Sequence, residues 1–214
     1  NDATLDYARY HADVLMGKDK GRLNFDVGLH YTLLHANTNI DRDFANRTLH
    51  VLSPSLRMRY ELTPSHHITV NYEYGATGNA LTSLVGAKYL KSFNQVISSN
   101  LDQFYSNYHR VSLTQLLMLP YLGLSVMNLL SYEHTKDAVT NNNNQDGYIS
   151  LIEKRAGSRK NLFSWLSTIE YRFIPIPLNI QANINYTHTY SPVYNFDELY
   201  KAKLNGIRFM AQAT

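Results

Sequence analysis

The most regular stretch of the sequence runs from residue 22 to residue 34, RLNFDVGLHYTLL, where apolar and polar side chains alternate. Its odd positions are all apolar, and its even positions are polar or glycine until Leu34. A period of two predicts a β-strand with one apolar and one polar face. A strand tilted across a bilayer needs about nine to eleven residues of this pattern. This stretch is therefore long enough to cross a membrane.

The same alternation recurs along the whole chain. It is found in residues 5–16, 53–62, 68–75, 105–117, 122–134, 161–173, 178–188 and 206–214. With the first stretch, these segments predict about nine antiparallel strands. No run approaches the roughly eighteen apolar residues of a membrane-spanning helix. The pattern therefore predicts an all-β fold.

The connections between the predicted strands are short and long in strict alternation. Four short turns fall at residues 17–21, 63–67, 119–123 and 174–178, and four long polar connections at 35–49, 76–104, 134–160 and 189–203. Short periplasmic turns and long extracellular loops are typical of an outer-membrane barrel. We expect the long connections to lack periodicity, with a short helix over 83–93 and an extended excursion outside the membrane at 148–154. In the 53–75 hairpin we expect Leu62 to pair with Ile68, to within two residues, which places Arg57 opposite Glu73.

Tyrosine is strongly enriched, with 17 Tyr against eight Phe and one Trp. One group of aromatic residues lies beside the short turns: Tyr60, Tyr121, Tyr171 and Phe173. A second group lies beside the long connections: Tyr72, Tyr74, Tyr132 and Tyr186. Two aromatic belts are expected at the two boundaries of a bilayer. The alternative is that aromatic residues simply favour strands.

The polar faces of the predicted strands carry charges and many asparagines. A dry protein core does not solvate such groups, whereas a wet barrel lumen does. We predict that a ligand, a small molecule or a peptide, binds to charged residues on this lumen face: Arg57, Arg59, Glu73, Asp26, His30, Glu170 and Arg172. The alternative is a soluble β-barrel or sandwich binding protein whose polar face meets water.

The motifs carry a resemblance to a known family. The chain resembles the C-terminal half of TonB-dependent receptor barrels of the Bacteroidota type. The resemblance lies in the strand at 22–34, the long connection after it and LSPSLRMRYELTPSHHITVNYEYG at 52–75, and the same pattern of strands and turns continues at 124–137 and 161–188. The resemblance implies an active transporter in the outer membrane of a Gram-negative bacterium. It also implies a barrel of about 22 strands with a plug domain, and a periplasmic partner that supplies energy.

The chain departs from that family in several respects. It has no plug domain and no N-terminal box for the energising partner, and its last residues, MAQAT, lack a terminal aromatic. An odd number of strands does not suit a bacterial single-chain barrel. We therefore expect residues 1–214 to be a section of one antiparallel transmembrane β-barrel domain. Its expected partners are the lipid bilayer and strands or a plug from residues outside this chain.

Other chemistry is weakly supported. The net charge is +3 with Lys and Arg scattered, whereas a nucleic-acid partner requires a basic stripe. With no Cys there is no thiolate metal site, and no phosphate-binding loop, HExxH or GxSxG motif is present. Weak candidates for metal or hydrolytic chemistry are His66 with His67, His11 and His30 with Asp13, and Ser131 with His134 and Asn128. We expect no cofactor, metal or catalytic site; a small self-standing barrel, enzymatic or adhesin-like, is the alternative.

Overall fold

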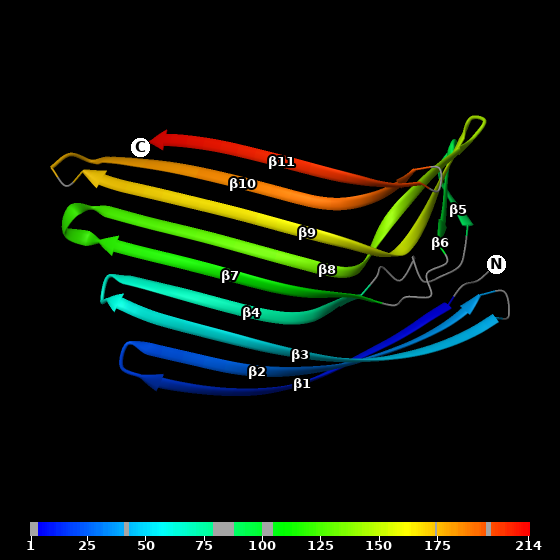
Figure 1. The fold of residues 1–214 in the computed structure, drawn as a ribbon, viewed down its shortest axis with the longest axis horizontal. Coiled ribbons are helices and arrows are strands. Elements are labelled where there is room, and N and C mark those ends of the chain that lie inside the picture. The colour runs from blue at the N-terminus through cyan, green and yellow to red at the C-terminus, as the bar shows by residue number, and fades with distance from the viewer. Residues whose placement is uncertain (1–3, 41–42, 79–87, 100–104, 174, 196–197) are drawn as a thin grey trace.

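The computed structural model describes residues 4–40, 43–78, 88–99, 105–173, 175–195 and 198–214. Eleven strands of these residues join into a single sheet (Figure 1). They are β1 (Thr4–Lys20), β2 (Leu23–Ile40), β3 (Asp43–Thr63), β4 (His66–Gly78), β5 (Lys88–Ser92), β6 (Gln95–Ser99), β7 (Tyr105–Leu119), β8 (Leu124–Asp146), β9 (Ile149–Phe173), β10 (Leu178–Asn195) and β11 (Glu198–Ala213). Within this part of the chain, no helix is long and apolar enough to cross a membrane.

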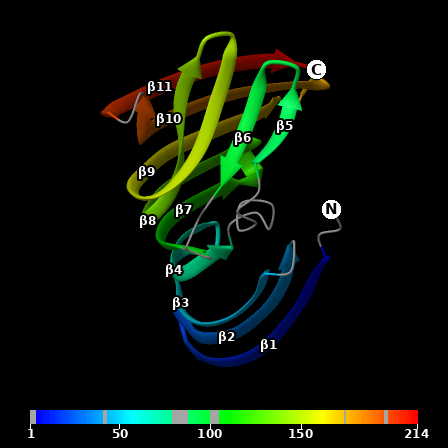
Figure 2. The ribbon, with the colours of Figure 1, turned by 90° about the vertical axis from the view of Figure 1, so that its right-hand side faces the viewer.

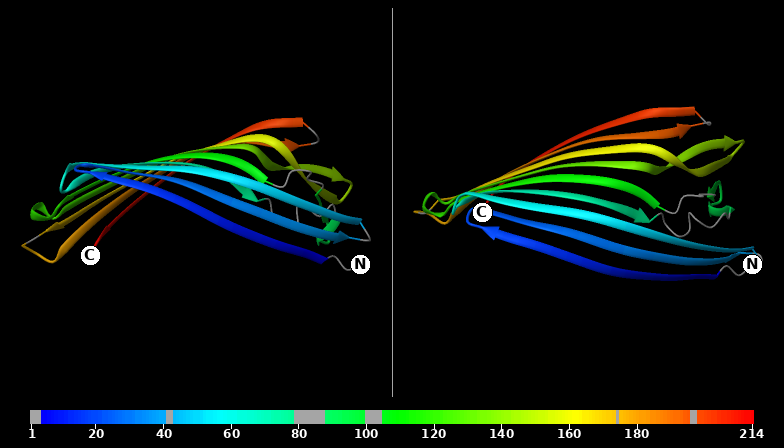
Figure 3. Two further views of the ribbon diagram at one scale, coloured as in Figure 1. Left: turned by 90° about the horizontal axis from the view of Figure 1, so that it is seen from below. Right: turned by 60° about the horizontal axis from the view of Figure 1, so that its bottom comes forward.

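The wall of the sheet is formed by β1, β2, β3, β4, β7, β8, β9, β10 and β11, each antiparallel to the next. It is strongly twisted and curved, and seen from the side of the hairpin tips it has a C-shaped section (Figures 2 and 3). The all-β antiparallel prediction is confirmed.

The register keeps the two faces of the wall distinct. Leu29 on β2 is opposite Val14 on β1 and Pro54 on β3, so apolar residues adjoin apolar residues across strands. This apolar face is open to the surroundings: Val14 is 61%, Leu29 42% and Ile169 45% exposed. Among the described residues, the buried apolar side chains are Val51, Ile97 and Ala138. The wall is thus a single layer without a conventional hydrophobic core, unlike the soluble sandwich considered above.

The short turns lie together at one end of the wall, and the tips of the long hairpins lie at the other (Figure 1). One short connection is the 3-10 helix η1 (Pro120–Leu122), which Gly123 ends with a φ of 63° and a hydrogen bond from its N–H to the Pro120 carbonyl. The Gly123 carbonyl in turn accepts a hydrogen bond from the Arg172 N–H at 2.8 Å. The predicted segregation of short and long connections is therefore confirmed.

The long connections are strands for most of their length, as expected at 148–154 and contrary to the expectation for the rest. Residues 35–40 and 43–49 extend β2 and β3, residues 134–160 extend β8 and β9 to a two-residue turn, and 189–195 and 198–203 extend β10 and β11. Paired backbones satisfy each other's hydrogen bonds in water without an apolar face, so the alternating pattern ends before the strands do. The helix expected over 83–93 is wrong at Lys88–Ser92, which forms β5; residues 83–87 lie outside the described residues.

The register of the hairpin of β3 and β4 differs from the expected one by two residues, the limit of the expected range, and the expected pairing of Arg57 with Glu73 is wrong. Tyr60, rather than Leu62, is opposite Ile68, and Arg57 is opposite Asn71, while Glu73 is opposite Ser55. The pairing passes from Glu61 to Thr63, so a bulge at Leu62 absorbs one residue next to the turn. A bulge of this kind changes the register without leaving a pattern in the sequence. The assignment of residues to faces is unaffected, because the shift is an even number.

The hairpin of β8 and β9 bends part of the way along its length, and beyond the bend its two strands pair with different strands. Its register shifts between Thr135 and Thr140, where Asp137 has a φ of 57°. The Ser106 hydroxyl donates a hydrogen bond to the Asp137 carbonyl at 2.9 Å, and the Ser158 hydroxyl donates one to the Ala138 carbonyl at 2.7 Å. Beyond this bend β9 pairs in parallel with β6, and β8 pairs in parallel with β10. Beyond the bend the outer hairpin therefore lies beside β6 and β5, which do not belong to the wall (Figure 2).

Candidate functional site

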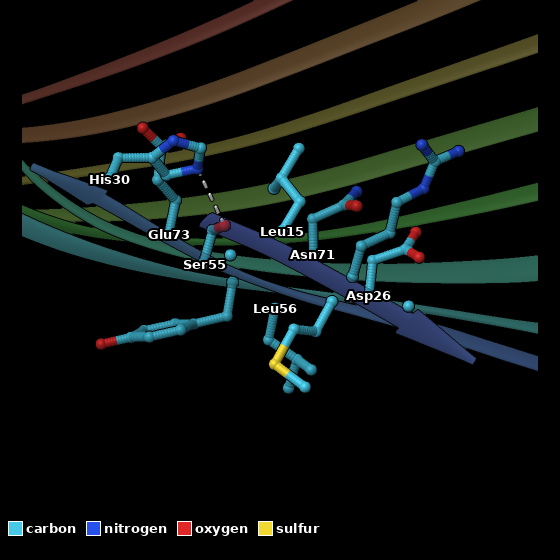
Figure 4. A pocket seen from close by; sticks show the side chains of 12 residues that line it. Leu15, Asp26, His30, Ser55, Leu56, Asn71 and Glu73 are labelled. Atoms are coloured by element: carbon cyan, nitrogen blue, oxygen red, sulfur yellow. Dashed lines mark hydrogen bonds between the residues drawn. The ribbon is translucent and has the colours of Figure 1, made fainter. Parts of the chain in front are cut away.

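All seven charged residues predicted to face the lumen lie on the polar face of the wall. Arg57 is opposite Asp26 on one side and Asn71 on the other, and Glu73 is two positions further along β4. Figure 4 shows Asp26, Glu73 and His30 projecting from one side of the sheet and Leu56 from the other. The polar residues project toward the hollow side of the curved wall (Figures 2 and 4). Their binding of a ligand stays a prediction.

Four of the seven residues, Asp26, His30, Arg57 and Glu73, line one open hollow of about 490 Å³ over β1 to β4, and Met16, Leu56 and Tyr72 of the opposite face contribute to the same lining. Ser55, Asn71 and Gly28 also line it. The other three predicted residues are not part of its lining: Arg59 contacts Glu61 at 3.2 Å, and Glu170 accepts a hydrogen bond from the Asn179 amide at 2.9 Å. Glu170 and Arg172 belong to β9, beside the short turns. The seven residues therefore share a face but do not form one cluster.

His30 is held between two strands. Its Nδ1 is 2.8 Å from Asp13 Oδ1 on β1, and its Nε2 is 3.2 Å from Ser55 Oγ on β3. Gly28 lies beside this pair of contacts, directly opposite Ser55. The sequence placed Asp13 and His30 on one face, but it did not show that Ser55 completes the line.

A second polar line crosses β4, β7 and β8. Arg110 contacts Glu133 at 2.6 Å and Glu73 at 3.8 Å, and Glu73 also accepts a hydrogen bond from the Tyr108 hydroxyl at 2.5 Å. The Arg110 guanidinium lies over the Tyr108 ring. These side chains are partly exposed, so each ion pair stabilises the wall by at most about 1 kcal/mol. Tyr108, Arg110 and Glu133 were missed from sequence, because pairing across strands depends on register.

The outward face carries the aromatic residues expected at its two boundaries. Near the short turns, Tyr171 and Phe173 meet edge to face with ring centroids 4.6 Å apart. Toward the hairpin tips, the Tyr72 hydroxyl lies 3.0 Å from His109 Nδ1, and Phe163 and Tyr186 are in ring contact. The contacts of Tyr72 with His109 and of Phe163 with Tyr186 join neighbouring strands, whereas Tyr171 and Phe173 lie two positions apart on β9.

A short polar row interrupts the apolar face. Asn128, which broke the sequence pattern, lies opposite Gln115 and Ser167. Its amide donates a hydrogen bond to Gln115 Oε1 at 3.4 Å, and the Gln115 amide nitrogen lies 3.1 Å from His66 Nε2. The polar side chains therefore satisfy one another, which lowers the cost of placing them on this face.

Of the weaker sequence candidates, His30 and Asp13 are in contact, whereas Ser131 and His134 are not brought together. Ser131 is opposite Ser112 on the polar face, whereas His134 is opposite His109 on the outward face, so the two cannot act together. His11 contacts the Thr32 hydroxyl at 3.1 Å. Within the described ranges, no three His, Asp or Glu side chains gather as metal ligands would.

Comparison with known proteins identifies the fold. No protein-family model matches the sequence, and no curated protein does. Among solved structures, the chain is similar to the outer membrane transporter YddB from Escherichia coli, with a TM-score of 0.53 and 9% sequence identity. The match covers 97% of this chain and 31% of the transporter, so the chain spans about a third of that protein's length. At this identity the likeness shows the fold, a section of an outer-membrane barrel wall.

Proposed function

We propose that this chain is part of the wall of an active-uptake barrel of the TonB-dependent type in the outer membrane of a Gram-negative bacterium. The observation that carries the proposal is the single-layer wall with an exposed apolar face and a charged, hydrogen-bonded opposite face. An apolar band outside and a polar lumen inside are the two surfaces a transmembrane barrel needs. The similarity to an outer membrane transporter supports the same assignment.

The edges of the sheet support a barrel larger than this chain. In the described residues β1 pairs with β2 alone, and β11 pairs with β10 alone, which leaves edges of 17 and 16 residues. An unpaired backbone group in hydrocarbon costs several kcal/mol. Further strands, from residues outside this chain or from a second polypeptide, would close the wall.

A barrel of more than twenty strands is too wide to be filled by its own side chains and holds a plug. A plugged barrel passes cargo when a periplasmic partner supplies energy, so the proposed activity is active uptake of a nutrient or a metal chelate. The cargo would contact the lumen face at Asp26, Arg57 and Glu73, where acceptors and a cation lie within one hollow.

The assignment of faces can be tested with single cysteines, because the sequence contains none. Val70 and Asn71 are adjacent on β4 and their side chains point to opposite faces of the sheet, so Val70→Cys and Asn71→Cys form a matched pair. In isolated outer membranes, a membrane-impermeant maleimide should label Asn71→Cys and spare Val70→Cys, and a lipid-soluble maleimide should label Val70→Cys. Equal labelling of both by the impermeant reagent would refute a lipid-facing apolar surface.

The transport assignment is tested on the intact assembly. A structure of the protein purified from the outer membrane should contain more than twenty strands and a plug. Uptake by cells that carry the protein, measured over a panel of labelled metal chelates and peptides, should stop when a protonophore collapses the proton gradient. A closed barrel of eight or ten strands formed by this chain alone would overturn active uptake.

A further inference from the structure

Three polar side chains from adjacent strands form a line on the lumen face: Asp13 on β1, His30 on β2 and Ser55 on β3. The two distances along the line are 2.8 Å and 3.2 Å. The Asp13 and His30 side chains are 53% and 37% exposed, so solutes in the lumen reach them. The line borders the hollow of about 490 Å³, and Figure 4 shows the contact between His30 and Ser55.

The chemistry of the three groups determines where the protons lie. An ionised carboxylate accepts hydrogen bonds and donates none, so the short contact with Asp13 requires a proton on His30 Nδ1. In neutral histidine Nε2 then carries a lone pair, and the Ser55 hydroxyl must donate to it. A hydroxyl hydrogen-bonded to a histidine base, with that base oriented by a third group, is the arrangement that activates a serine nucleophile.

Gly28 is part of this geometry. It is buried in the middle of β2 and directly opposite Ser55. A Cβ at this position would lie 3.0 Å from His30 Nε2 and closer still to Ser55 Oγ. Glycine within a strand is destabilising relative to alanine, and it often marks a site of close approach. At this point of β2, the missing side chain leaves room for the histidine and the serine to meet.

We propose that Ser55, His30 and Asp13 form a hydrolytic triad that cleaves carboxylic esters entering the lumen. Ser55 Oγ bonds to the ester carbonyl carbon while its proton passes to His30 Nε2. The tetrahedral intermediate breaks the bond from the carbonyl carbon to the alcohol oxygen, and His30 returns the proton to the departing alkoxide. Water then attacks the acyl-serine and gives its proton to His30, which passes it to Ser55 as the carboxylic acid leaves.

The hollow also supplies donors for the oxygen that becomes charged. Arg57 and Asn71 line it beside Ser55, and both carry N–H groups. Preorganised donors of this kind stabilise an oxyanion. The site is open to water, which weakens such stabilisation, so esters with good leaving groups are the expected substrates rather than amides.

The test uses the intact protein in isolated outer membranes and a fluorophosphonate reporter that reacts with activated serines. Peptide mass spectrometry should find the label on Ser55. Ser55→Ala should abolish labelling, whereas Ser53→Ala, which removes the serine directly opposite His30, should leave it unchanged. His30→Gln should slow labelling by roughly 100-fold or more, because general-base catalysis contributes about 10²–10⁴.

The pH dependence separates a base from a purely structural histidine. In the unsubstituted protein, the labelling rate should rise with pH, and His30→Gln should remove this rise, because general-base catalysis needs the base without its proton. Asp13→Asn should lower the rate while the barrel stays folded, as judged by resistance to SDS before heating. Labelling that persists in Ser55→Ala, or an unlabelled folded protein beside a labelled control hydrolase, would overturn the proposal. Neither readout depends on transport, so failure here leaves the uptake proposal standing.

Discussion

Replacing Ile184 by arginine is the most direct energetic test of the outward face. Ile184 lies between Ser167 on β9 and Phe209 on β11, six residues beyond Leu178, where β10 begins. A rise of about 3.3 Å per residue and a tilt of about 40° place it about 15 Å above the strand end. The apolar band of such a barrel is about 25 Å tall, so Ile184 lies close to its midplane.

An arginine facing lipid at this depth costs about 2–4 kcal/mol, which lowers the folding equilibrium constant roughly 30- to 700-fold. The matched control is the adjacent Asn183→Arg, whose side chain faces the wet lumen. This control loses the hydrogen bond from the Thr168 hydroxyl to Asn183 Oδ1, which contributes about 1 kcal/mol. The expected order of stability is therefore the unsubstituted protein, Asn183→Arg and then Ile184→Arg.

The assay folds the intact protein into phosphatidylcholine vesicles at a series of urea concentrations. The folded fraction is the fraction that resists SDS and migrates fast before heating. The urea midpoint should fall clearly for Ile184→Arg and much less for Asn183→Arg. Equal losses for the two variants would refute the assignment of a lipid face and a lumen face, and would favour a closed soluble core.

Three further outcomes are expected. Gly123→Ala should lower the free energy of unfolding more than Gly21→Ala. Both glycines have φ above 60°, but a Cβ at Gly123 would also clash with a backbone carbonyl of β9, and the two urea midpoints measure the difference. Trp165, which is 36% exposed on the outward face, should lose fluorescence in vesicles of brominated lipid, and unchanged emission would contradict lipid contact. Arg110→Met should destabilise the wall by at most about 1 kcal/mol at low salt, because Glu133 loses its partner, and the loss should shrink at high salt.

The sequence predicted the strand segments that have an apolar face more accurately than the segments that have none. Alternation arises where one face is apolar, so the stretch from 22 to 34 was recognised and the extension to Ile40 was not. The same holds for the outer half of β8, whose asparagine-rich sequence has no apolar face.

In the candidate site, the face on which each residue lies was predicted correctly, but its cross-strand partner was not. Alternation correctly placed Asp26, Arg57 and Glu73 on one face, because face depends on the parity of position along a strand. It gave the wrong partner for Arg57, because partners depend on register, and register depended on a bulge next to the turn. Ser55 was missed for the same reason: its approach to His30 comes from pairing between strands 25 residues apart in sequence.

The parallel pairing of β6 with β9 has a consequence for how the chain folds. Apart from β4 and β7, consecutive wall strands pair across short turns, whereas Gln95 of β6 pairs with Ser150 of β9, 55 positions later. Closing a longer loop costs more entropy before its contacts form, and nonlocal contacts slow folding. The wall strands should therefore assemble hairpin by hairpin, and β5, β6 and the outer half of β9 should dock last. Newly inserted chains would then pass through a stage in which the wall strands are paired while β5, β6 and the outer half of β9 are still undocked and accessible to proteases.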